Sequence, residues 1–272
     1  MAEDPAARLT VVSLNTRGVP VFGSLLADRY AAIGPALNGG DADVVCVQEV
    51  LSWWHLRLLV RGMRAFRHVS FLVSPFGPSG GLVTFSRLPV SGTTYQGFGM
   101  PPRAAGISRG VRFRAVLKGA LVTRLSRPGP ALCVVNTHPL ANWDGDWSED
   151  NRFYPLHKAQ LDVLARVVRG IPGPTVVCGD FNVDRESSLF SGFMADTGLA
   201  DAFEGRCPAT FRAEYLPAGK EPHCIDFILT SDGVKAEAAT VVLAGKEPLG
   251  RAGLGYVSDH VGLRARLLLG LS

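Results

Sequence analysis

The sequence predicts an α/β (α+β) protein in which two mainly antiparallel sheets pack face to face, with helices on their outer sides. Many apolar runs of strand length are interrupted by only a few amphipathic segments of helix length, without a strict strand–helix repeat. Several runs occur in pairs joined by turn residues, which is typical of antiparallel hairpins. The 272 residues are 47% hydrophobic and 19% charged. Because no shift in composition divides the chain, we expect one domain spanning residues 1–272.

Strands and helices alternate in the first quarter of the chain. Residues 9–15 form an apolar, β-rich run that ends in polar residues and a turn glycine, and residues 43–50 form a second apolar run that ends in a glutamine and a glutamate. Between them, residues 25–37 carry apolar side chains at helical spacing and are followed by Asn-Gly-Gly. Residues 51–64 have a broad apolar face at the same spacing, which predicts a second helix.

A hairpin and a basic segment follow. Residues 69–73 and 81–86 flank a turn rich in proline and glycine, which predicts a hairpin-like pair of strands. Residues 93–98 form another strand after a short break. Residues 99–113 are rich in glycine, proline and arginine, and we expect a mobile basic loop that is either a solvated connection or a lid in contact with the substrate.

A second hairpin and a long helix occupy the middle of the chain. Residues 118–125 and 131–138 flank the turn signal Ser-Arg-Pro-Gly at 126–129. Residues 140–152 are polar and carry two tryptophans, whereas residues 155–169 form an amphipathic helix. Tryptophan in the polar segment could be a buried anchor or a contact to lipid, and an exposed tryptophan there would favour lipid.

The last third returns to strands. Residues 175–182 are an apolar run broken by a glycine and closed by polar residues, and residues 187–197 have helical spacing. Residues 224–229 form a strand with an aspartate inside it. The final strands are expected at 238–243 and 261–268, the latter directly after Ser-Asp-His.

The strand at 175–182 carries the clearest local signal for a site. In an extended segment, residues two positions apart point to the same side, so Asp180 and Asn182 are expected to face one site. Gly179 has no Cβ and allows the backbone or a ligand to approach closely. An ordinary strand end with an Asx turn is the alternative interpretation.

Polar side chains recur where the predicted strands end. A carboxylate at the end of an apolar strand is costly unless it is solvated, paired or bound to a cation, which makes Glu49 a candidate metal ligand. Several hard oxygen donors without a cluster of thiolates suit Mg²⁺ or Mn²⁺. The polar residues at strand ends, or within a strand for the aspartate at 226, are Asn15, Glu49, Asn136, His138, Asp180, Asn182, Asp226, Asp259 and His260.

Composition restricts the possible functions further. The net charge of +4 and the pI near 8.9 favour anionic partners weakly, because the basic residues are scattered. The five cysteines have no CxxC spacing, which argues against a structural zinc site. The N-terminus is charged and no apolar run is long enough to span a bilayer, so we expect a cytoplasmic protein without a signal peptide or a transmembrane segment.

Six short motifs, in this order, resemble those of the endonuclease/exonuclease/phosphatase superfamily, which is also called deoxyribonuclease-I-like. They are Leu14-Asn15, Gln48-Glu49, Asn136-Thr-His138, Gly179-Asp-Phe-Asn182, Ile225-Asp226 and Ser258-Asp-His260. The resemblance covers nearly the whole chain. It implies a four-layered α/β/β/α sandwich and a phosphoric ester hydrolase that depends on a divalent metal.

Within that superfamily the chain is similar to the neutral sphingomyelinase branch. The likeness lies in residues 79–90, in Lys118-Gly119 at the start of a strand, and in Asn136-Thr-His-Pro-Leu-Ala141, which is followed by a polar loop and by His157-Lys-Ala-Gln-Leu161. This resemblance implies a phosphodiesterase that acts on a phospholipid.

The resemblance also implies which residues hold the metal. Glu49 would bind Mg²⁺ or Mn²⁺ with Asn15 beside it, and Asp259 would lie near the ion or support the histidine that follows it. The metal would polarise a phosphoryl oxygen and neutralise developing charge.

The catalytic roles follow from the same resemblance. His260 would be the general base for an attacking water, oriented by Asp226. Asp180 and Asn182 would position the water or the leaving group, and Asp180 competes with His260 for the role of base. His138 would donate a hydrogen bond to a phosphate oxygen and stabilise the transition state.

The function predicted from these residues is a metal-dependent phosphodiesterase on a phospholipid, in peripheral contact with a membrane, or on another small phosphorylated molecule. A nuclease on DNA or RNA is the alternative, and it would need a continuous basic groove. A binding module with the same fold is the third possibility, which the loss of the metal ligands or of the last histidine would favour. All of these residues are present.

Overall fold

The computed structural model describes residues 8–19, 24–127 and 131–270. The turn expected at 126–129 and the N-terminal residues used to judge a signal peptide lie wholly or partly outside these ranges. The helices are α1 (Leu26–Asn38), α2 (Trp53–Gly62), α3 (Arg109–Val116), α4 (Tyr154–Arg169) and α5 (Ser188–Thr197), with short 3₁₀ turns at Ser79–Gly81, Ala213–Tyr215 and Gly250–Ala252. None of the helices in these described ranges has the length and apolar character needed to cross a membrane.

Two six-stranded sheets form the middle of the molecule. The strands are β1 (Arg8–Asn15), β2 (Val44–Gln48), β3 (His68–Ser70), β4 (Val83–Ser86), β5 (Val90–Gly97), β6 (Gly119–Leu125), β7 (Leu132–Thr137), β8 (Thr175–Asp180), β9 (Ala200–Asp201), β10 (Asp226–Thr230), β11 (Val234–Val242), β12 (Glu247–Pro248), β13 (Leu254–Gly255) and β14 (Gly262–Leu269). The first sheet has the order β11-β14-β1-β2-β4-β3, and the second has the order β5-β6-β7-β8-β10-β9. β12 and β13 pair separately.

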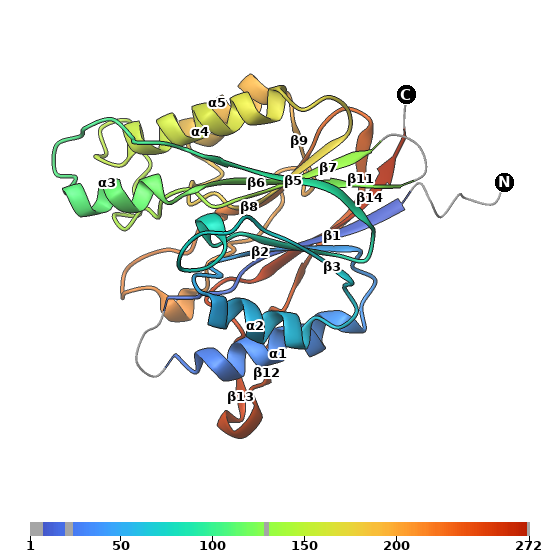
Figure 1. Ribbon diagram of the computed structural model, residues 1–272. Helices are drawn as coiled ribbons and strands as arrows, with labels where there is room; N and C mark the ends of the chain where they lie inside the picture. The colour runs from blue at the N-terminus through green and yellow to red at the C-terminus, as the bar shows by residue number, and fades with distance from the viewer. Residues whose placement is uncertain (1–7, 20–23, 128–130, 271–272) are drawn as a thin grey trace.

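The sheets pack face to face with helices outside, which confirms the predicted four-layered sandwich. Figure 1 shows α1 and α2 on the outer side of the first sheet, and α4 and α5 on the outer side of the second. Each sheet is mainly antiparallel, as expected, but contains one parallel pair, β1 with β2 and β7 with β8. Both hairpins predicted from turn signals are present as antiparallel pairs, β3 with β4 and β6 with β7.

Alternating side chains in β1 and β8 decide which residues face the gap between the sheets. In β1, Leu9 and Val11 belong to the core between the sheets, while Val12 and Leu14 pack under α1 and α2. In β8, Val176 and Cys178 belong to the core between the sheets, while Val177 packs under α4 and α5. Because the side-chain period is two, the last residues of both strands, Asn15 and Asp180, lie on the same inner face.

The two parallel pairs explain why the polar strand ends meet. The parallel strands of a pair end at the same edge of their sheet, so β1 and β2 deliver their last residues together, and so do β7 and β8. The two pairs also lie against each other, since β1 and β2 contact β8 across the gap. Four carboxyl ends therefore converge at one end of the sandwich, opposite the start of β1 and the end of β14 in Figure 1.

The segment expected to be a loop at 99–113 contains a helix instead. Ser108 caps α3 by accepting a hydrogen bond from the N–H of Val111 at 3.3 Å. Ala115 is buried in a small core with Leu140, and the side chain of Ile107 packs against that core. Glycine and arginine content masked this helix in the sequence, because its buried contacts come from residues distant in the chain.

Candidate active site

A cavity of about 1180 Å³ opens where the four strand ends converge. Seven of the eight predicted site residues line it: Asn15, Glu49, His138, Asp180, Asn182, Asp259 and His260. The eighth, Asp226, lies behind His260, whose ring it contacts at 2.8 Å. The tertiary structure thus brings together the eight residues that were predicted as catalytic or metal-binding.

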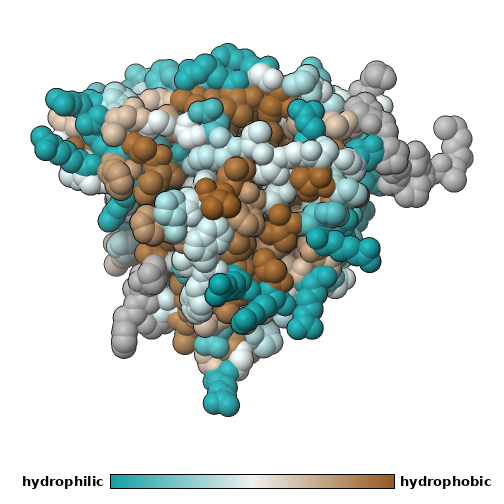
Figure 2. Space-filling view, in the orientation of Figure 1, coloured by the Kyte–Doolittle hydropathy of each residue, from teal (hydrophilic) through white to brown (hydrophobic). Residues whose placement is uncertain are grey.

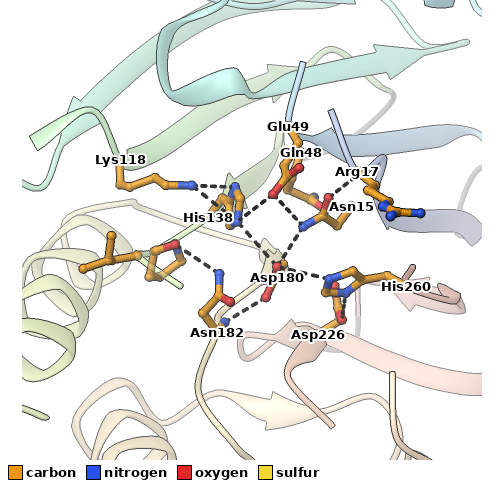
Figure 3. Close-up of polar contacts among 12 residues, drawn as sticks. Asn15, Arg17, Gln48, Glu49, Lys118, His138, Asp180, Asn182, Asp226 and His260 are labelled. Carbon is orange, nitrogen blue, oxygen red and sulfur yellow. Dashed lines mark hydrogen bonds and ion pairs between the residues drawn. The ribbon is translucent and has the colours of Figure 1, made fainter. Parts of the chain in front are cut away.

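Asp180 is the centre of this arrangement. Its Oδ2 accepts a hydrogen bond from Asn15 Nδ2 at 2.9 Å and lies 3.4 Å from His138 Nε2 and 3.7 Å from His260 Nε2 (Figure 3). Burial disfavours the ionised carboxyl, but His260, His138 and Asn15 together hold the pKa of Asp180 well below its usual range. Asp180 is therefore a firmly ionised group and a weak base.

Glu49 extends toward the same point from the other sheet. Its Oε1 lies 3.5 Å from Asn15 Nδ2 and 3.9 Å from His138 Nε2, and its Oε2 accepts from the N–H of Gly18 at 2.8 Å. β2 ends one residue earlier because Glu49 has a left-handed backbone, with φ of 64°. Non-glycine residues adopt this conformation rarely and often at functional sites.

The two carboxylates fit a divalent cation. Oxygens of Glu49 and Asp180 share the same neighbours, Asn15 Nδ2 and His138 Nε2, so they converge from both sheets. Hard oxygen donors of this kind suit Mg²⁺ or Mn²⁺. The amide oxygen of Asn15 accepts from the backbone N–H of Arg17 at 2.9 Å, so its amide nitrogen faces the carboxylates. A ligand role for the Asn15 oxygen stays a prediction and requires rotation of the amide.

A second group of potential ligands overlaps the first. Ligand atoms of Asp180, Asp226 and His260 lie within 4.8 Å of one another. However, His260 Nδ1 and Asp226 Oδ2 already bond each other at 2.8 Å. The geometry of this group is that of an oriented histidine, so Glu49 and Asp180 are the better placed pair for an ion.

His260 is held by carboxylates on both of its ring nitrogens. Burial opposes its charged form, but the carboxylates of Asp226 and Asp180 raise the pKa of His260 to about 10. Nδ1 bonds Asp226, which leaves Nε2 directed at Asp180 and the cavity. The hydroxyl of Ser258 accepts from the backbone N–H of His260 at 3.1 Å and donates to the carbonyl of Asn15 at 2.6 Å, which ties the segment before β14 to the end of β1.

Lys118 lies against the ring of His138. Its side-chain nitrogen is 3.0 Å from Nδ1 and 3.4 Å from Nε2 of His138, and a charged lysine can only donate. Because the contact with Nδ1 is the shorter one and Nε2 faces the carboxylates of Asp180 and Glu49, we assign Nδ1 as the acceptor and Nε2 as the ring N–H. Burial lowers the pKa of Lys118, while Glu49 and Asp180 oppose that change. The motif Lys118-Gly119 carried a family likeness in the sequence, but nothing there indicated its contact with His138.

Asn182 is positioned at the site by a turn and not by an extended strand. The expectation that 175–182 is extended throughout is wrong, because β8 ends at Asp180 and Asn182 has φ of 52°. The N–H of Asn182 donates to Asp180 Oδ1 at 2.8 Å, which makes an Asx turn. Its side chain donates to the carbonyl of Pro139 at 3.2 Å, and its own carbonyl accepts from Trp147 Nε1 at 2.9 Å. Both residues still line one cavity.

Gly179 is required by a close approach of the backbone. A Cβ at this position would lie 2.0 Å from the carbonyl oxygen of Thr137 in the neighbouring strand, and its φ is 146°. The expectation that glycine here permits a close approach is confirmed, and the approaching group is β7.

Asp259 lies at the edge of the cavity. Its Oδ2 is 3.4 Å from Nε of Arg17, whose guanidinium lies 4.3 Å from the ring centre of Tyr215. Burial raises the pKa of Asp259 and Glu49 adds to this effect, while His260 and Arg17 oppose it. The metal-binding role of Asp259 stays a prediction.

A buried amide pair joins the two sheets beneath the site, and the sequence analysis assigned it no role. Gln48 Nε2 donates to Asn136 Oδ1 at 2.8 Å, and Asn136 Nδ2 donates to the carbonyls of Val47 and Val83 at 3.0 Å. Both amides are fully buried. In the sequence motifs, Gln48 directly precedes Glu49 and Asn136 lies two positions before His138. The motifs did not show that the two amides pair across the sheets.

The comparisons with known proteins agree with this fold and this set of residues. The model of the Endonuclease/Exonuclease/phosphatase family matches residues 12–260. Among curated relatives, a putative neutral sphingomyelinase of Drosophila melanogaster is 24% identical over 96% of this chain, and sphingomyelin phosphodiesterase 2 of Homo sapiens is 26% identical over 72%. The matches span 61% and 46% of the lengths of these two relatives.

Solved structures resemble the fold at lower identity. Sphingomyelinase C from Streptomyces griseocarneus has a TM-score of 0.70 at 18% identity and covers 95% of this chain and 99% of its own. Beta toxin from Staphylococcus aureus with bound magnesium ions has a TM-score of 0.68 at 18% identity, with 94% and 98% covered. D. rerio TDP2 complexed with a single-stranded DNA product has a TM-score of 0.69 at 16% identity, with 96% and 99% covered. These likenesses show the fold.

Proposed function

The chain belongs to the endonuclease/exonuclease/phosphatase family, and we propose that it is a metal-dependent phosphodiesterase that hydrolyses the headgroup ester of a phospholipid. One observation carries the proposal: nitrogens of three side chains and the carboxylate of Glu49 converge around Asp180. The nitrogens belong to Asn15, His138 and His260. Such a centre can hold a cation, an activated water and a phosphate in contact with one another.

The oxygens of Glu49 and Asp180 would hold Mg²⁺ or Mn²⁺, with Asp259 and Asn15 as further candidate ligands. When bound, the ion polarises a phosphoryl oxygen and neutralises developing negative charge. Beta toxin, which shares this fold, has been solved with bound magnesium ions, and this supports the choice of metal.

His260 is the better candidate for the general base. Asp180 competes for this role, but its low pKa makes it a poor proton acceptor. His260 has a raised pKa and presents Nε2 to the cavity, while Asp226 accepts from Nδ1 and orients the ring. The imidazole loses its proton more readily once the charge of Asp180 is neutralised. Asp180 and Asn182 then position the attacking water and the phosphate.

His138 and Lys118 would stabilise the transition state. The Nε2–H of His138 points into the cavity, because Lys118 occupies Nδ1. A preorganised donor of this kind binds a phosphoryl oxygen more strongly as negative charge develops on it. The nearby ammonium adds a positive charge at the same side of the cavity.

Two observations support a phospholipid as the substrate. The curated relatives named above are a putative neutral sphingomyelinase and a sphingomyelin phosphodiesterase. The polar centre is surrounded by apolar residues of the cavity wall, among them Leu51, Phe76, Leu117 and Trp143, which fits a substrate with a polar ester and an apolar remainder.

A nuclease is the second candidate. TDP2 with a DNA product shares the fold, and Arg114, Lys118 and Lys220 line the cavity. We rank it lower because the wall residues are largely apolar, whereas nucleic acid binding rests on extended phosphate contacts. A binding module without activity ranks third, because Glu49, Asp180 and His260 are all present and line one cavity.

A hydrolysis assay tests the proposal. Sphingomyelin in vesicles, bis-p-nitrophenyl phosphate and single-stranded DNA are each incubated with the enzyme in Mg²⁺ and in EDTA. We expect metal-dependent cleavage of the lipid and of the soluble diester, with kcat lowered on the order of 10²-fold or more in His260→Ala. His68→Ala, on edge strand β3 and outside the cavity, is the matched control. Cleavage of DNA alone would select the nuclease, and no cleavage of any substrate would contradict both.

A further inference from the structure

Exposed apolar side chains gather at the mouth of the catalytic cavity. Phe76 is 81% exposed and Trp143 is 53% exposed, and both line the cavity. Leu117, Val19 and Leu51 are also exposed and line the same cavity. Exposed hydrophobic residues scattered singly need no explanation, whereas a group around one opening marks an interaction site.

These side chains come from separate segments of the chain. Phe76 belongs to the turn between β3 and β4, Leu117 follows α3, and Trp143 lies in the loop before α4. Val19 and Leu51 follow β1 and β2. Five independent connections thus present large apolar groups at the end of the sandwich where the site opens.

The backbone holds these groups outward. The turn that carries Phe76 is closed by a hydrogen bond from the N–H of Ser74 to the carbonyl of Gly77 at 2.9 Å, and the carbonyl of Phe76 accepts from the N–H of Trp53 at 3.2 Å. Trp143 contacts the ring of Phe153 edge-on at 5.6 Å. Both aromatic residues are therefore anchored at their base while much of their surface stays in water.

Positive charge accompanies the apolar groups. Residues 99–118 contain five basic residues and no acidic one. Within α3, Phe113 is exposed beside Arg114, whose guanidinium lies 5.9 Å from the ring centre of Trp143. At the end of the molecule where α3 lies, Figure 2 shows hydrophobic side chains directly beside strongly hydrophilic ones. Aromatic and basic side chains in this combination favour the interface of an anionic membrane.

Acidic residues lie next to this surface in the loop after Trp143, and part of their charge is neutralised. The carboxylate of Asp144 is bound by Arg152 at 2.7 Å, and Lys220 donates to the backbone carbonyl of Asp144 at 2.9 Å. The loop beyond it, with Asp146 and Glu149, stays acidic. The positive region is therefore centred on α3, on one side of the cavity mouth.

We propose that an apolar rim, together with the arginines of residues 99–114, docks onto the surface of a bilayer that contains anionic phospholipid. The rim consists of Val19, Leu51, Phe76, Leu117 and Trp143 at the cavity mouth, together with Phe113, which is exposed on α3 next to Arg114 in the chain. Docking in this way turns the cavity toward the lipid headgroups and directs the start of β1 and the end of β14 away from the membrane (Figure 1). The inference rests on the proposed function, since it delivers the enzyme to the substrate class assigned above.

A bilayer fits this rim better than a folded partner or a nucleic acid. The apolar groups come from separate connections around one opening, whereas recognition of a helix or a strand uses a hydrophobic groove or a sheet edge. A nucleic acid would gain little from Val19, Leu51 or Leu117, because these exposed aliphatic side chains have no aromatic face on which a base can stack. Lipid accepts scattered apolar anchors beside basic side chains.

Vesicle flotation tests the proposal with the full chain. Vesicles of phosphatidylcholine are compared with vesicles of phosphatidylcholine and phosphatidylserine, for wild type and for the double variant Phe76→Ser/Phe113→Ser. Leu254→Ser is the matched control, because Leu254 is 70% exposed on β13, away from the cavity. We expect binding to the anionic vesicles that falls on the order of tenfold or more in the double variant and is unchanged in the control.

A charge variant separates the two components of docking. Arg103→Gln/Arg109→Gln removes two exposed arginines and should weaken binding to anionic vesicles several-fold, with little effect on pure phosphatidylcholine. Thermal unfolding of each variant confirms that it is folded. Equal flotation of wild type and the double variant would overturn the proposal. Loss of single-stranded DNA binding in the arginine variant, without vesicle binding by wild type, would also overturn it in favour of a nucleic-acid interface.

Wild-type hydrolysis of soluble bis-p-nitrophenyl phosphate, measured in parallel, keeps this inference separate from the proposed function. Cleavage of the soluble diester without flotation would reject docking and leave the phosphodiesterase intact. Flotation that depends on the rim, without cleavage of any ester, would support docking and reject the assigned reaction.

Discussion

Asp226→Asn gives the sharpest test of how the site controls its histidine. The substitution keeps a side chain of the same size next to His260 Nδ1, 2.8 Å away, but removes its negative charge. We expect His260 to lose most of its preference for the protonated form, because Asp226 is the strongest of the groups that raise its pKa. The amide can also present its oxygen or its nitrogen to the ring, so the tautomer is less well defined.

The magnitude follows from the pKa. A pKa of about 10 against an ordinary value of 6.5 corresponds to about 5 kcal/mol in favour of the imidazolium. This preference is shared between the carboxylates of Asp226 and Asp180 and is reduced by burial. Because burial continues to disfavour the charged ring after the substitution, the pKa should fall to about the ordinary value or below.

The assay is an NMR titration of the imidazole C–H signals in metal-free protein. Wild-type His260 should show no titration between pH 6 and 8, on the grounds of its raised pKa, whereas the variant should titrate in or below that range. In the presence of metal, kcat should fall on the order of 10²-fold or more, because an unoriented imidazole is a poor base.

Two results would refute the reasoning. If His260 in Asp226→Asn stays protonated through neutral pH, Asp226 is not what holds the proton on the ring. If the pKa falls but kcat changes less than a few-fold, His260 is not the base, and Asp180 regains that role. His223→Ala, at the outer wall of the cavity, helps to assign the signals.

Three further outcomes are expected. Buried His157 donates to the carbonyl of Leu140 at 2.8 Å, and burial lowers its pKa to about 4. The folded state is therefore destabilised as pH falls from 6.5 toward 4, by about 3 kcal/mol in all, and urea unfolding of His157→Gln should lack this pH dependence. Gly179→Ala should destabilise the fold by about 3 kcal/mol or more, because its Cβ meets the Thr137 carbonyl at 2.0 Å, and an unchanged Tm would disprove the clash. At pH 8 we expect Mg²⁺ binding to release protons, and we expect the affinity for Mg²⁺ to fall at least tenfold in Glu49→Gln. Calorimetry in buffers of different ionisation enthalpy measures both quantities. Binding without proton release would mean that the ion does not compete with the protonated histidine.

The arrangement of strands followed largely from local pattern. Apolar runs of strand length predicted β1 and β8 with Asn15 and Asp180 among the polar residues at their ends, and turn signals between strands predicted the hairpins that are present. The helix α3 was missed, because its stability depends on a serine cap and on burial against Leu140, a residue of another segment. Propensity alone does not contain such a contact.

The candidate site was predictable as a set of residues because carboxylates, amides and histidines at the ends of apolar strands are costly unless they serve a site. The same residues did not reveal their roles. Asp180 and Asn182 were expected on one face of a strand, but an Asx turn places Asn182. The contact between Lys118 and His138, from which we assign the tautomer of the histidine, was also not foreseeable.

The sequence by itself determined the family of fold, the order of the motifs and the chemical types of the groups at the strand ends, because these depend on side-chain period, turn chemistry and residue identity. Only the tertiary structure decided which carboxylate is a weak base and which histidine holds a proton. Those properties depend on burial and on distances between groups far apart in the chain, such as Asn15 and Asp180, which are 165 positions apart and 2.9 Å from each other.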